Sequence, residues 1–217
     1  MPFFSVIIPV FDRARTLPAT LDSVNAQGFK DFEIIVVDDG STDGSVGVAQ
    51  AHPADIKIIE QKNKGPGAAR NVGIEHARGK YVCFLDSDDV WFPWTLKVFF
   101  QAIQSEGNPA FLTGKDVRFH SDEPPRILEM KEVKLRYFQN YYSTSRDDVW
   151  IGTCAACIEK TALQKVGGFA ERNINGEDSD LWLKLGVERG FVIIESPEVF
   201  GYRMHSGSAI GSIDKTL

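Results

Sequence analysis

Four short apolar segments in the first half of the chain are each followed by a segment with helical spacing. The apolar segments, rich in β-branched and aromatic residues, are residues 3–9, 32–37, 56–60 and 81–85. The helical segments are residues 16–27, a segment from a cap at 41–43 toward residue 52, residues 68–77 and residues 94–106. This alternation predicts an α/β fold with a mostly parallel central sheet, helices on both faces and right-handed crossovers.

Segments that contain turn-forming or acidic residues end three of these predicted strands. They are residues 9–12, 38–41 and 86–89. The carboxyl ends of parallel strands meet at one edge of a sheet, and ligands of open α/β sheets bind outside that edge. We therefore expect the three segments to form one site.

The segment at residues 86–89 is the most acidic of the three. Asp86 and Asp88 are two residues apart, so in an extended chain both side chains project to the same side. A divalent cation shared with a diphosphate suits this Asp-x-Asp pair. The alternative is that the aspartates end the strand and stabilise a turn or a helix start.

Charge and cysteine content restrict the partners and the compartment. The net charge of −6 and the pI of about 5.3 give no support for a nucleic-acid surface, so phosphate binding should be local and metal-assisted. Cys83, Cys154 and Cys157 cannot form a closed disulfide set, which favours a reducing compartment. The Cys154-Ala-Ala-Cys157 spacing leaves a redox site or half of a metal site as an alternative to buried thiols. We favour buried thiols, because there is no second cysteine pair.

The chain has no apolar run near the roughly 18 residues that cross a bilayer. Residues 2–11 lack the basic start and the cleavage site of a secretion signal. We therefore predict a cytoplasmic protein, and peripheral contact with the inner face of the membrane stays open.

The regular alternation fades after about residue 107. Strands are predicted at residues 110–119, 153–159, 191–195 and 199–204, and helices at 160–166 and 178–189. Residues 121–125 read as a turn-rich connector, and the Gly/Ser-rich residues 205–212 as a mobile segment. Residues 126–142 mix basic, aliphatic and aromatic residues, which predicts an amphipathic cover helix, with a membrane-surface patch or an acceptor loop as alternatives.

Seven short segments carry a family resemblance. They are SVIIPVFD at 5–12, residues 33–41 ending in DDGS, residues 63–71 with Gly65, Ala69, Arg70 and Asn71, FLDSDD at 84–89, VGGF at 166–169, GEDSDL at 176–181 and YRMH at 202–205. In this order they resemble the inverting glycosyltransferases of family 2, which have the GT-A fold. The resemblance implies a single GT-A domain over residues 1–217, with a nucleotide-sugar-binding half at 1–106 and an acceptor-binding half at 107–217.

The resemblance also implies a donor site. Its expected nucleotide-sugar contacts are Pro9, Val10, Phe11, Asp12, Asp38, Asp39, Arg70, Asp86 and Ser87. Asp39 is the expected contact to the base edge, because a carboxylate accepts hydrogen bonds from a uracil-type N–H. The alternatives are a helix-leading turn for the Asp38-Asp39 pair and a solvated helix arginine for Arg70.

Metal and catalytic roles follow from the same resemblance. Asp88 and His205 would bind Mn²⁺ or Mg²⁺, with His205 on a mobile lid, while Asp89 would belong to a local turn. Asp178 would be the general base on the acceptor hydroxyl, with Glu177 beside it. The alternative for Glu177 and Asp178 is simple stabilisation of a helix start.

Taken together, these roles imply metal-assisted, inverting transfer of a sugar from a nucleotide-diphosphate sugar, with UDP expected, to a hydroxyl of a glycan or a lipid-linked glycan. One alternative is a sugar-phosphate nucleotidyltransferase, but residues 9–13 contain no glycine-rich phosphate loop. Another alternative is a nucleotide-sensing module, which would bind the nucleotide without transfer.

Overall fold

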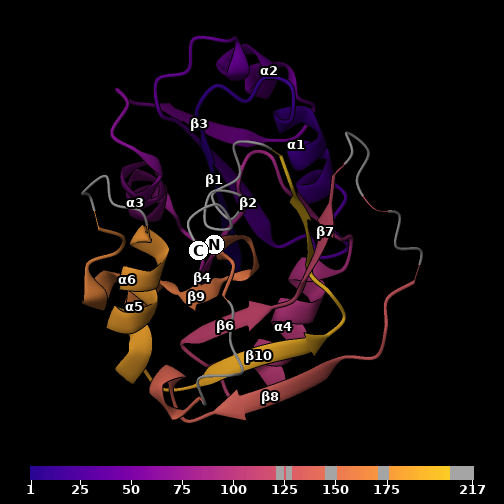
Figure 1. Cartoon of the computed structure of the whole chain (residues 1–217), viewed down its shortest axis with the longest axis vertical. Coiled ribbons are helices and arrows are strands. Elements are labelled where there is room, and N and C mark those ends of the chain that lie inside the picture. Colours follow the sequence, from indigo (N-terminus) through magenta and orange to yellow (C-terminus); the bar gives the residue numbers. More distant parts are fainter. Residues whose placement is uncertain (121–124, 126–128, 145–150, 171–175, 206–217) are drawn as a thin grey trace, which may run out of the picture.

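The computed structural model describes residues 1–120, 125, 129–144, 151–170 and 176–205. These residues form an eight-stranded sheet with helices on both faces, and a separate three-stranded sheet (Figure 1). The larger sheet has the order β3-β2-β1-β4-β9-β6-β10-β8, and four of its seven pairings are parallel. The predicted α/β fold with a mostly parallel sheet is confirmed.

The first half contains the four predicted strand and helix pairs. They are β1 (Phe4–Val10), α1 (Leu17–Asn25), β2 (Phe32–Asp38), α2 (Ser45–Ala51), β3 (Ile56–Glu60), α3 (Pro66–His76), β4 (Tyr81–Phe84) and α4 (Thr95–Ser105). Pro66 opens α3, a position where its missing N–H costs the helix nothing. Helix α2 begins only at Ser45, because the Asp43 side chain accepts the Ser45 N–H (3.0 Å) and closes a turn before it.

Alternate residues of β1 face two separate hydrophobic cores. Val6 and Ile8 belong to a core that contains α1 and α4, whereas Ile7 belongs to a core that contains α3, α5 (Lys160–Val166) and α6 (Glu177–Lys184). The strand is buried along its whole length, as expected for a central parallel strand covered on both faces. Figure 1 shows α3, α5 and α6 together on one side of the sheet.

The order of the first four strands reverses between β1 and β4. Strands β1, β2 and β3 extend the sheet in one direction, and β4 then pairs with the other side of β1, with Ile7 opposite both Ile35 and Phe84. Loops that leave β1 and β4 therefore diverge and open a crevice at the carboxyl ends of the strands. The three polar segments predicted to share a site follow β1, β2 and β4.

The second half completes both sheets. Strands β6 (Phe111–Gly114), β8 (Lys134–Phe138), β9 (Cys157–Glu159) and β10 (Phe191–Ser196) extend the large sheet. Strands β5 (Val90–Trp91), β11 (Phe200–Arg203) and β7 (Asp116–Phe119) form the small one. Helix α5 has the predicted bounds, and it ends at Gly167, whose φ of 79° is the left-handed conformation typical of a helix C-cap.

The predicted cover helix at residues 126–142 is wrong. Residues 134–138 form the edge strand β8, antiparallel to β10, and Tyr141–Ser143 form a single 3₁₀ turn, η1; residues 126–128 lie outside the described part. Leu135 packs against one core and Phe138 against the other. In a strand, side chains alternate between the two faces, so apolar residues can enter both cores. A cover helix would place its apolar residues on one face only.

Three other predicted elements are divided. The strand at 110–119 breaks at Lys115 into β6 and β7, which enter different sheets. The strand at 153–159 begins as a 3₁₀ turn, η2 (Thr153–Ala155), before β9. The helix predicted at 178–189 ends as α6 at Lys184 and continues as the 3₁₀ turn η3 (Leu185–Val187). At this change the Tyr142 hydroxyl donates a hydrogen bond to the Leu183 carbonyl (2.6 Å), and the Tyr142 ring packs against Gly186. The connector at 121–124 and the segment 206–212 lie outside the described residues.

Among the residues that the structure describes, no helix has the length and apolar character that a bilayer crossing needs.

Two helical glycines give a matched test of this packing. Gly73 in α3 lies against β1, and a Cβ there would overlap the Ile7 side chain, whereas a Cβ at Gly47 in α2 would meet no atom within 4 Å. We expect Gly73→Ala to lower the free energy of unfolding by about 1–3 kcal/mol through overpacking. Gly47→Ala should raise it by about 0.5–1 kcal/mol, because alanine favours the helix. Urea denaturation measures both, and equal effects would contradict the close packing of α3 on β1.

Candidate functional site

The carboxyl end of β2 carries two buried aspartates with different surroundings. Asp38 Oδ2 accepts the N–H groups of Gly40 (3.1 Å) and Ser41 (3.0 Å), and Gly40 has a φ of 83° that only glycine adopts readily. Within the described part of the chain, Asp38 Oδ1 is buried and has no hydrogen-bond partner. A buried acceptor without a partner is costly, so this oxygen is a candidate to receive an N–H from a ligand.

Both oxygens of Asp39 are already engaged. Oδ1 accepts the Gln61 side-chain amide (2.7 Å) and the Lys64 N–H (2.8 Å), and Oδ2 accepts the Gly65 N–H (2.8 Å). Asp39 therefore holds the loop between β3 and α3 against the end of β2. Its predicted contact with a base edge stays a prediction, but the geometry favours Asp38 for that contact.

The end of β1 contributes backbone and one exposed ring. Pro9 and Val10 are buried in the strand, so they can offer a ligand only their backbone, whereas Phe11 is 45% exposed at the rim. Asp12 has a φ of 49° and accepts the Thr42 N–H (2.7 Å), while its own N–H donates to the Ser41 hydroxyl (3.0 Å). These contacts tie the β1 loop to the β2 loop.

Arg70 of α3 joins the two halves of the site. Its side chain is 5% exposed, and it donates to Asp86 Oδ1 (2.6 Å) and to Glu177 Oε1 (3.1 Å). Burial alone would lower the pKa of Arg70, but the Asp86 and Glu177 carboxylates outweigh burial and hold that pKa above its ordinary value. The Phe169 ring lies against the guanidinium, with 5.3 Å from Cζ to the ring centroid. The burial of Arg70 rules out the alternative of a solvated helix arginine, and the predicted contact with a nucleotide stays a prediction.

Residues 86–89 form a turn, so Asp86 and Asp88 do not share one partner. The Asp89 N–H donates to the Asp86 carbonyl (3.1 Å), and the Ser87 carbonyl accepts the Thr16 hydroxyl (2.9 Å). Asp86 faces Arg70, whereas Asp88 Oδ2 accepts from Arg13 Nε (3.2 Å) and lies 3.1 Å from His205 Nε2. The expectation of an extended Asp-x-Asp pair is corrected by this turn.

Asp88 and His205 fit a divalent cation. Two cis ligands with bonds of about 2.1 Å lie about 3.0 Å apart, close to the separation between Asp88 Oδ2 and His205 Nε2. A carboxylate oxygen and an imidazole nitrogen are also ligands that Mn²⁺ accepts. Arg13 occupies the same oxygen and would have to release it for a cation.

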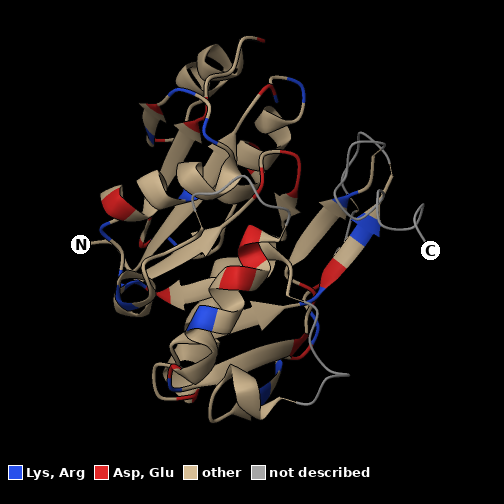
Figure 2. Ribbon diagram, turned by 60° about the vertical axis from the view of Figure 1, so that its left-hand side comes forward, with Lys and Arg blue, Asp and Glu red and all other residues tan. Residues whose placement is uncertain are grey.

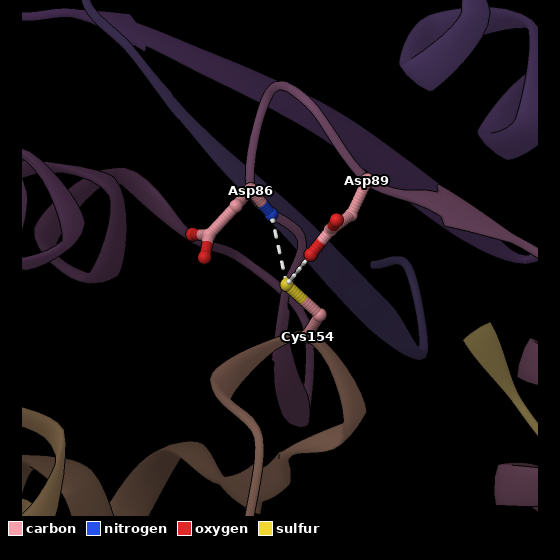
Figure 3. Close-up of side chains that lie close together, drawn as sticks. All are labelled: Asp86, Asp89 and Cys154. Carbon is pink, nitrogen blue, oxygen red and sulfur yellow. Dashed lines mark hydrogen bonds between the residues drawn. The ribbon is translucent and has the colours of Figure 1, made fainter. Parts of the chain in front are cut away.

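A second cluster, Asp86, Asp89 and Cys154, also brings three potential metal-ligand atoms within 4.8 Å. Figure 3 shows that the Asp86 carboxylate points away from the sulfur. The Cys154 thiol donates to Asp89 Oδ2 (3.0 Å) and accepts the Asp86 N–H (3.3 Å), while Asp89 Oδ1 accepts the Arg203 N–H (2.8 Å). These contacts account for a structural cluster without a metal. All three cysteines are free and buried, as predicted.

The start of α6 is acidic, as Figure 2 shows by the red segments of this helix. Its first turn contains Glu177, Asp178 and Asp180. Glu177 is committed to Arg70, and Asp180 forms an ion pair with Lys184 (2.6 Å). Asp178 is half-buried, and its Oδ1 accepts the Ser179 N–H (2.7 Å). Asp178 is therefore the carboxylate of this turn that forms no ion pair among the described residues.

Three residues of the site escaped the sequence analysis. Arg13 follows the polar segment after β1, so its position at the rim was open to prediction, but its partner 75 positions away was not. Asp89 was assigned to a local turn, although its side chain reaches β11. Cys154 was expected to be buried, and nothing in the sequence placed it beside residues 86–89.

Comparison with known families and proteins identifies the family and the fold. A family model described as glycosyl transferase family 2 matches residues 5–171. The chain is 48% identical over 220 residues to an uncharacterized glycosyltransferase, RC0461, of Rickettsia conorii, covering 98% of this chain and 32% of that protein. It is 30% identical over 212 residues to the amylovoran biosynthesis glycosyltransferase AmsB of Erwinia amylovora, covering 89% of this chain and 67% of AmsB. The chain thus spans about a third to two thirds of the length of these relatives.

Solved structures with the same fold are similarly longer. TarS 1–349 of S. aureus in complex with UDP-GlcNAc superposes with a TM-score of 0.80 at 24% identity, over 98% of this chain and 61% of that one. The mannosyltransferase PcManGT of Pyrobaculum calidifontis, in complex with GDP-Man and Mn²⁺, has a TM-score of 0.68 at 20% identity, over 95% and 58%. These likenesses confirm the GT-A fold.

The buried Asp89 should make stability depend on pH. Burial, together with the Asp86 charge, raises the pKa of Asp89 to about 8 in the folded protein, whereas an unfolded aspartate titrates near its ordinary value. The folded state therefore holds one extra proton between about pH 4 and pH 8. The stability that this extra proton contributes is fully present below about pH 4. It falls by about 1.4 kcal/mol per pH unit as the pH rises from about 4, and it is lost above about pH 8.

Asp89→Asn removes this titration, so the stability of the variant relative to the unmodified protein should rise steadily from pH 5 to pH 8. Denaturation followed by tryptophan fluorescence in metal-free buffer measures the difference. Parallel stability curves for the two proteins would show that Asp89 is ionised in the folded state.

Proposed function

The chain belongs to glycosyl transferase family 2, and we propose that it transfers a sugar from a UDP-sugar to an acceptor hydroxyl, with inversion at the anomeric carbon. The observation that carries the proposal is the buried, unpartnered Asp38 Oδ1 at the same sheet edge as the Asp88 and His205 pair. One oxygen suits a base N–H, and the pair suits the cation of a diphosphate. The UDP-GlcNAc in the TarS structure supports the same class of donor.

The nucleoside would lie at the ends of β1 and β2. Asp38 would accept the imide N–H of uracil, and the exposed Phe11 ring would pack on the base. Asp12 and Asp39 would shape the pocket by holding the loops around it. Pro9 and Val10 would line it with backbone, while Asp86 and Ser87 would face the ribose.

The diphosphate would lie near Asp88, His205 and Arg13. Asp88 and His205 would hold Mn²⁺ or Mg²⁺, and Mn²⁺ is the ion in the PcManGT complex. When bound, such a cation supplies positive charge that stabilises the departing diphosphate. Arg13, freed from Asp88, would carry a second positive charge to the same place.

Asp178 would act as the general base. An acceptor hydroxyl must lose its proton as it attacks, and Asp178 is the carboxylate of its turn without a cationic partner among the described residues. Glu177 would act differently, because its ion pair with Arg70 fixes the start of α6 beside Asp86. In this arrangement residues 1–106 would supply most of the donor site, and residues 107–217 would supply the acceptor site together with His205, within one domain. The name of AmsB, an amylovoran biosynthesis glycosyltransferase, supports a role in polysaccharide biosynthesis.

Asp178→Asn should lower the rate of UDP release from a UDP-sugar and acceptor mixture by about 10²–10⁴-fold, because the amide cannot take a proton. Binding of UDP should be unchanged in calorimetry. The matched control is Asp180→Asn in the same helical turn, which should retain the rate. Unchanged turnover in Asp178→Asn would remove the base assignment.

Asp38→Asn should weaken UDP binding by about 5–150-fold, because its amide oxygen can still serve Gly40 and Ser41 but its N–H₂ then faces the N–H of the base. The melting temperature should change little. Asp39→Asn should instead lower the melting temperature, since it disturbs the loop between β3 and α3. Thermal shift and calorimetry separate the two effects, and full UDP affinity in Asp38→Asn would refute the base contact.

A further inference from the structure

The antiparallel pairing of β5 with β11 stops before the chain reaches the cation pair. Phe200 pairs with Trp91 and Gly201 with Val90, and β5 begins at Val90. The same register continued by two residues would set Arg203 opposite Asp88, but residues 86–89 form the turn described above. Backbone pairing with β5 therefore does not reach Tyr202 and Arg203, which pair with Arg118 and Phe119 of β7 on the other side of β11.

The Asp89 side chain takes the place of the missing pairing. Its Oδ1 accepts the Arg203 N–H at 2.8 Å, the type of bond that a backbone carbonyl would make in a sheet. The Arg203 side chain adds a second contact with the same turn, because its Nε donates a hydrogen bond to the Asp88 carbonyl at 2.8 Å. On the other side of β11, the Met204 N–H donates to the Phe119 carbonyl at 2.8 Å.

The other oxygen of Asp89 is anchored to the protein interior. Oδ2 accepts the Cys154 thiol, and the Asp89 carbonyl accepts the Thr20 hydroxyl (2.8 Å) from α1. The side chain is completely buried, so its contacts are with protein on every side. Asp89 thus holds a fixed position from which it can place both its neighbour Asp88 and the end of β11.

We propose that Asp89 is a positioning residue that fixes His205 beside Asp88 through its hydrogen bond to Arg203. His205 lies two residues after Arg203 and reaches Asp88 Oδ2 at 3.1 Å. The inference rests on the proposed function, because the cation is expected to bind Asp88 and His205. It adds that Asp89 is not a ligand of that cation, and that an uncharged acceptor of the same shape would serve equally well.

Three substitutions test the role. Asp89→Asn keeps the oxygen that accepts the Arg203 N–H and can donate to the Cys154 sulfur. Asp89→Leu has the same branched shape, with two larger methyl groups in place of the oxygens, and it has no acceptor. Asp89→Ala also removes the acceptor and has a smaller side chain. If the leucine variant does not fold, the alanine variant is compared with Asp89→Asn in its place.

Two measurements are made on each variant and on the unmodified protein. Electron paramagnetic resonance of free Mn²⁺ in the presence of UDP gives the Mn²⁺ affinity, and amide hydrogen exchange reports the Arg203 N–H bond. We expect Asp89→Leu to weaken Mn²⁺ binding by about 10–100-fold, the usual effect of losing a group that orients a metal ligand, and Asp89→Asn to stay within about threefold. Hydrogen exchange of the Arg203 amide should accelerate about 10-fold in Asp89→Leu and should be unchanged in Asp89→Asn.

Three results would overturn the proposal. Equal Mn²⁺ affinity in Asp89→Leu and the unmodified protein, with faster Arg203 exchange, would make the hydrogen bond structural only. An equal loss in Asp89→Asn and Asp89→Leu would show that the carboxylate itself binds the ion. Failure of the unmodified protein to bind Mn²⁺ and UDP would overturn the proposed function together with this inference, whereas either of the first two results leaves the function standing.

Discussion

The site depends on one ion-pair chain, Asp86–Arg70–Glu177, in which a buried guanidinium lies between two partly exposed carboxylates. Arg70 comes from α3, Asp86 follows β4, and Glu177 opens α6, so a single guanidinium joins three elements that are far apart in the sequence. A buried arginine is tolerated only when carboxylates compensate its charge. This requirement places the first turn of α6, and with it Asp178, at the same sheet edge as residues 86–89.

The strand order supplies the second constraint. Because the sheet grows in opposite directions from β1, the loops after β1 and β4 separate and leave room for a ligand at the carboxyl ends. Within that crevice the polar groups are divided between two tasks. Asp12, Asp39 and Asp89 accept hydrogen bonds from protein donors and hold loops. Asp38 keeps one buried oxygen without a partner among the described residues, and Asp88 lies beside Arg13 and His205. The proposed chemistry uses the second group, and the first group keeps the second in place.

Local patterns predicted the parts of this fold that local rules control. The strands and helices of the first half, the C-cap at Gly167 and the acidic edge followed from periodicity and turn chemistry. Strands β1, β2 and β4 are largely buried, and short helical crossovers connect the strands of this half. The second half was harder. The alternation in β8 was read as a helix because its apolar residues serve two cores, and β6 and β7 form one apolar run that turns from one sheet into another. The partners of Arg13, Arg70 and Asp89 depend on contacts across 16 to 114 positions, which no local pattern contains.

The proposed donor site places the base at Asp38 and the diphosphate at Asp88 and His205, along one edge of the sheet. The most direct test is a crystal structure of the protein with UDP and Mn²⁺. We predict the uracil N–H within hydrogen-bond distance of Asp38 Oδ1, and Mn²⁺ bound by Asp88 and His205 with the Arg13 side chain displaced. UDP bound elsewhere, for instance in the groove lined by Gln61, Lys64, Asn71 and Glu75, or Mn²⁺ bound by Asp89 and Cys154, would contradict the account.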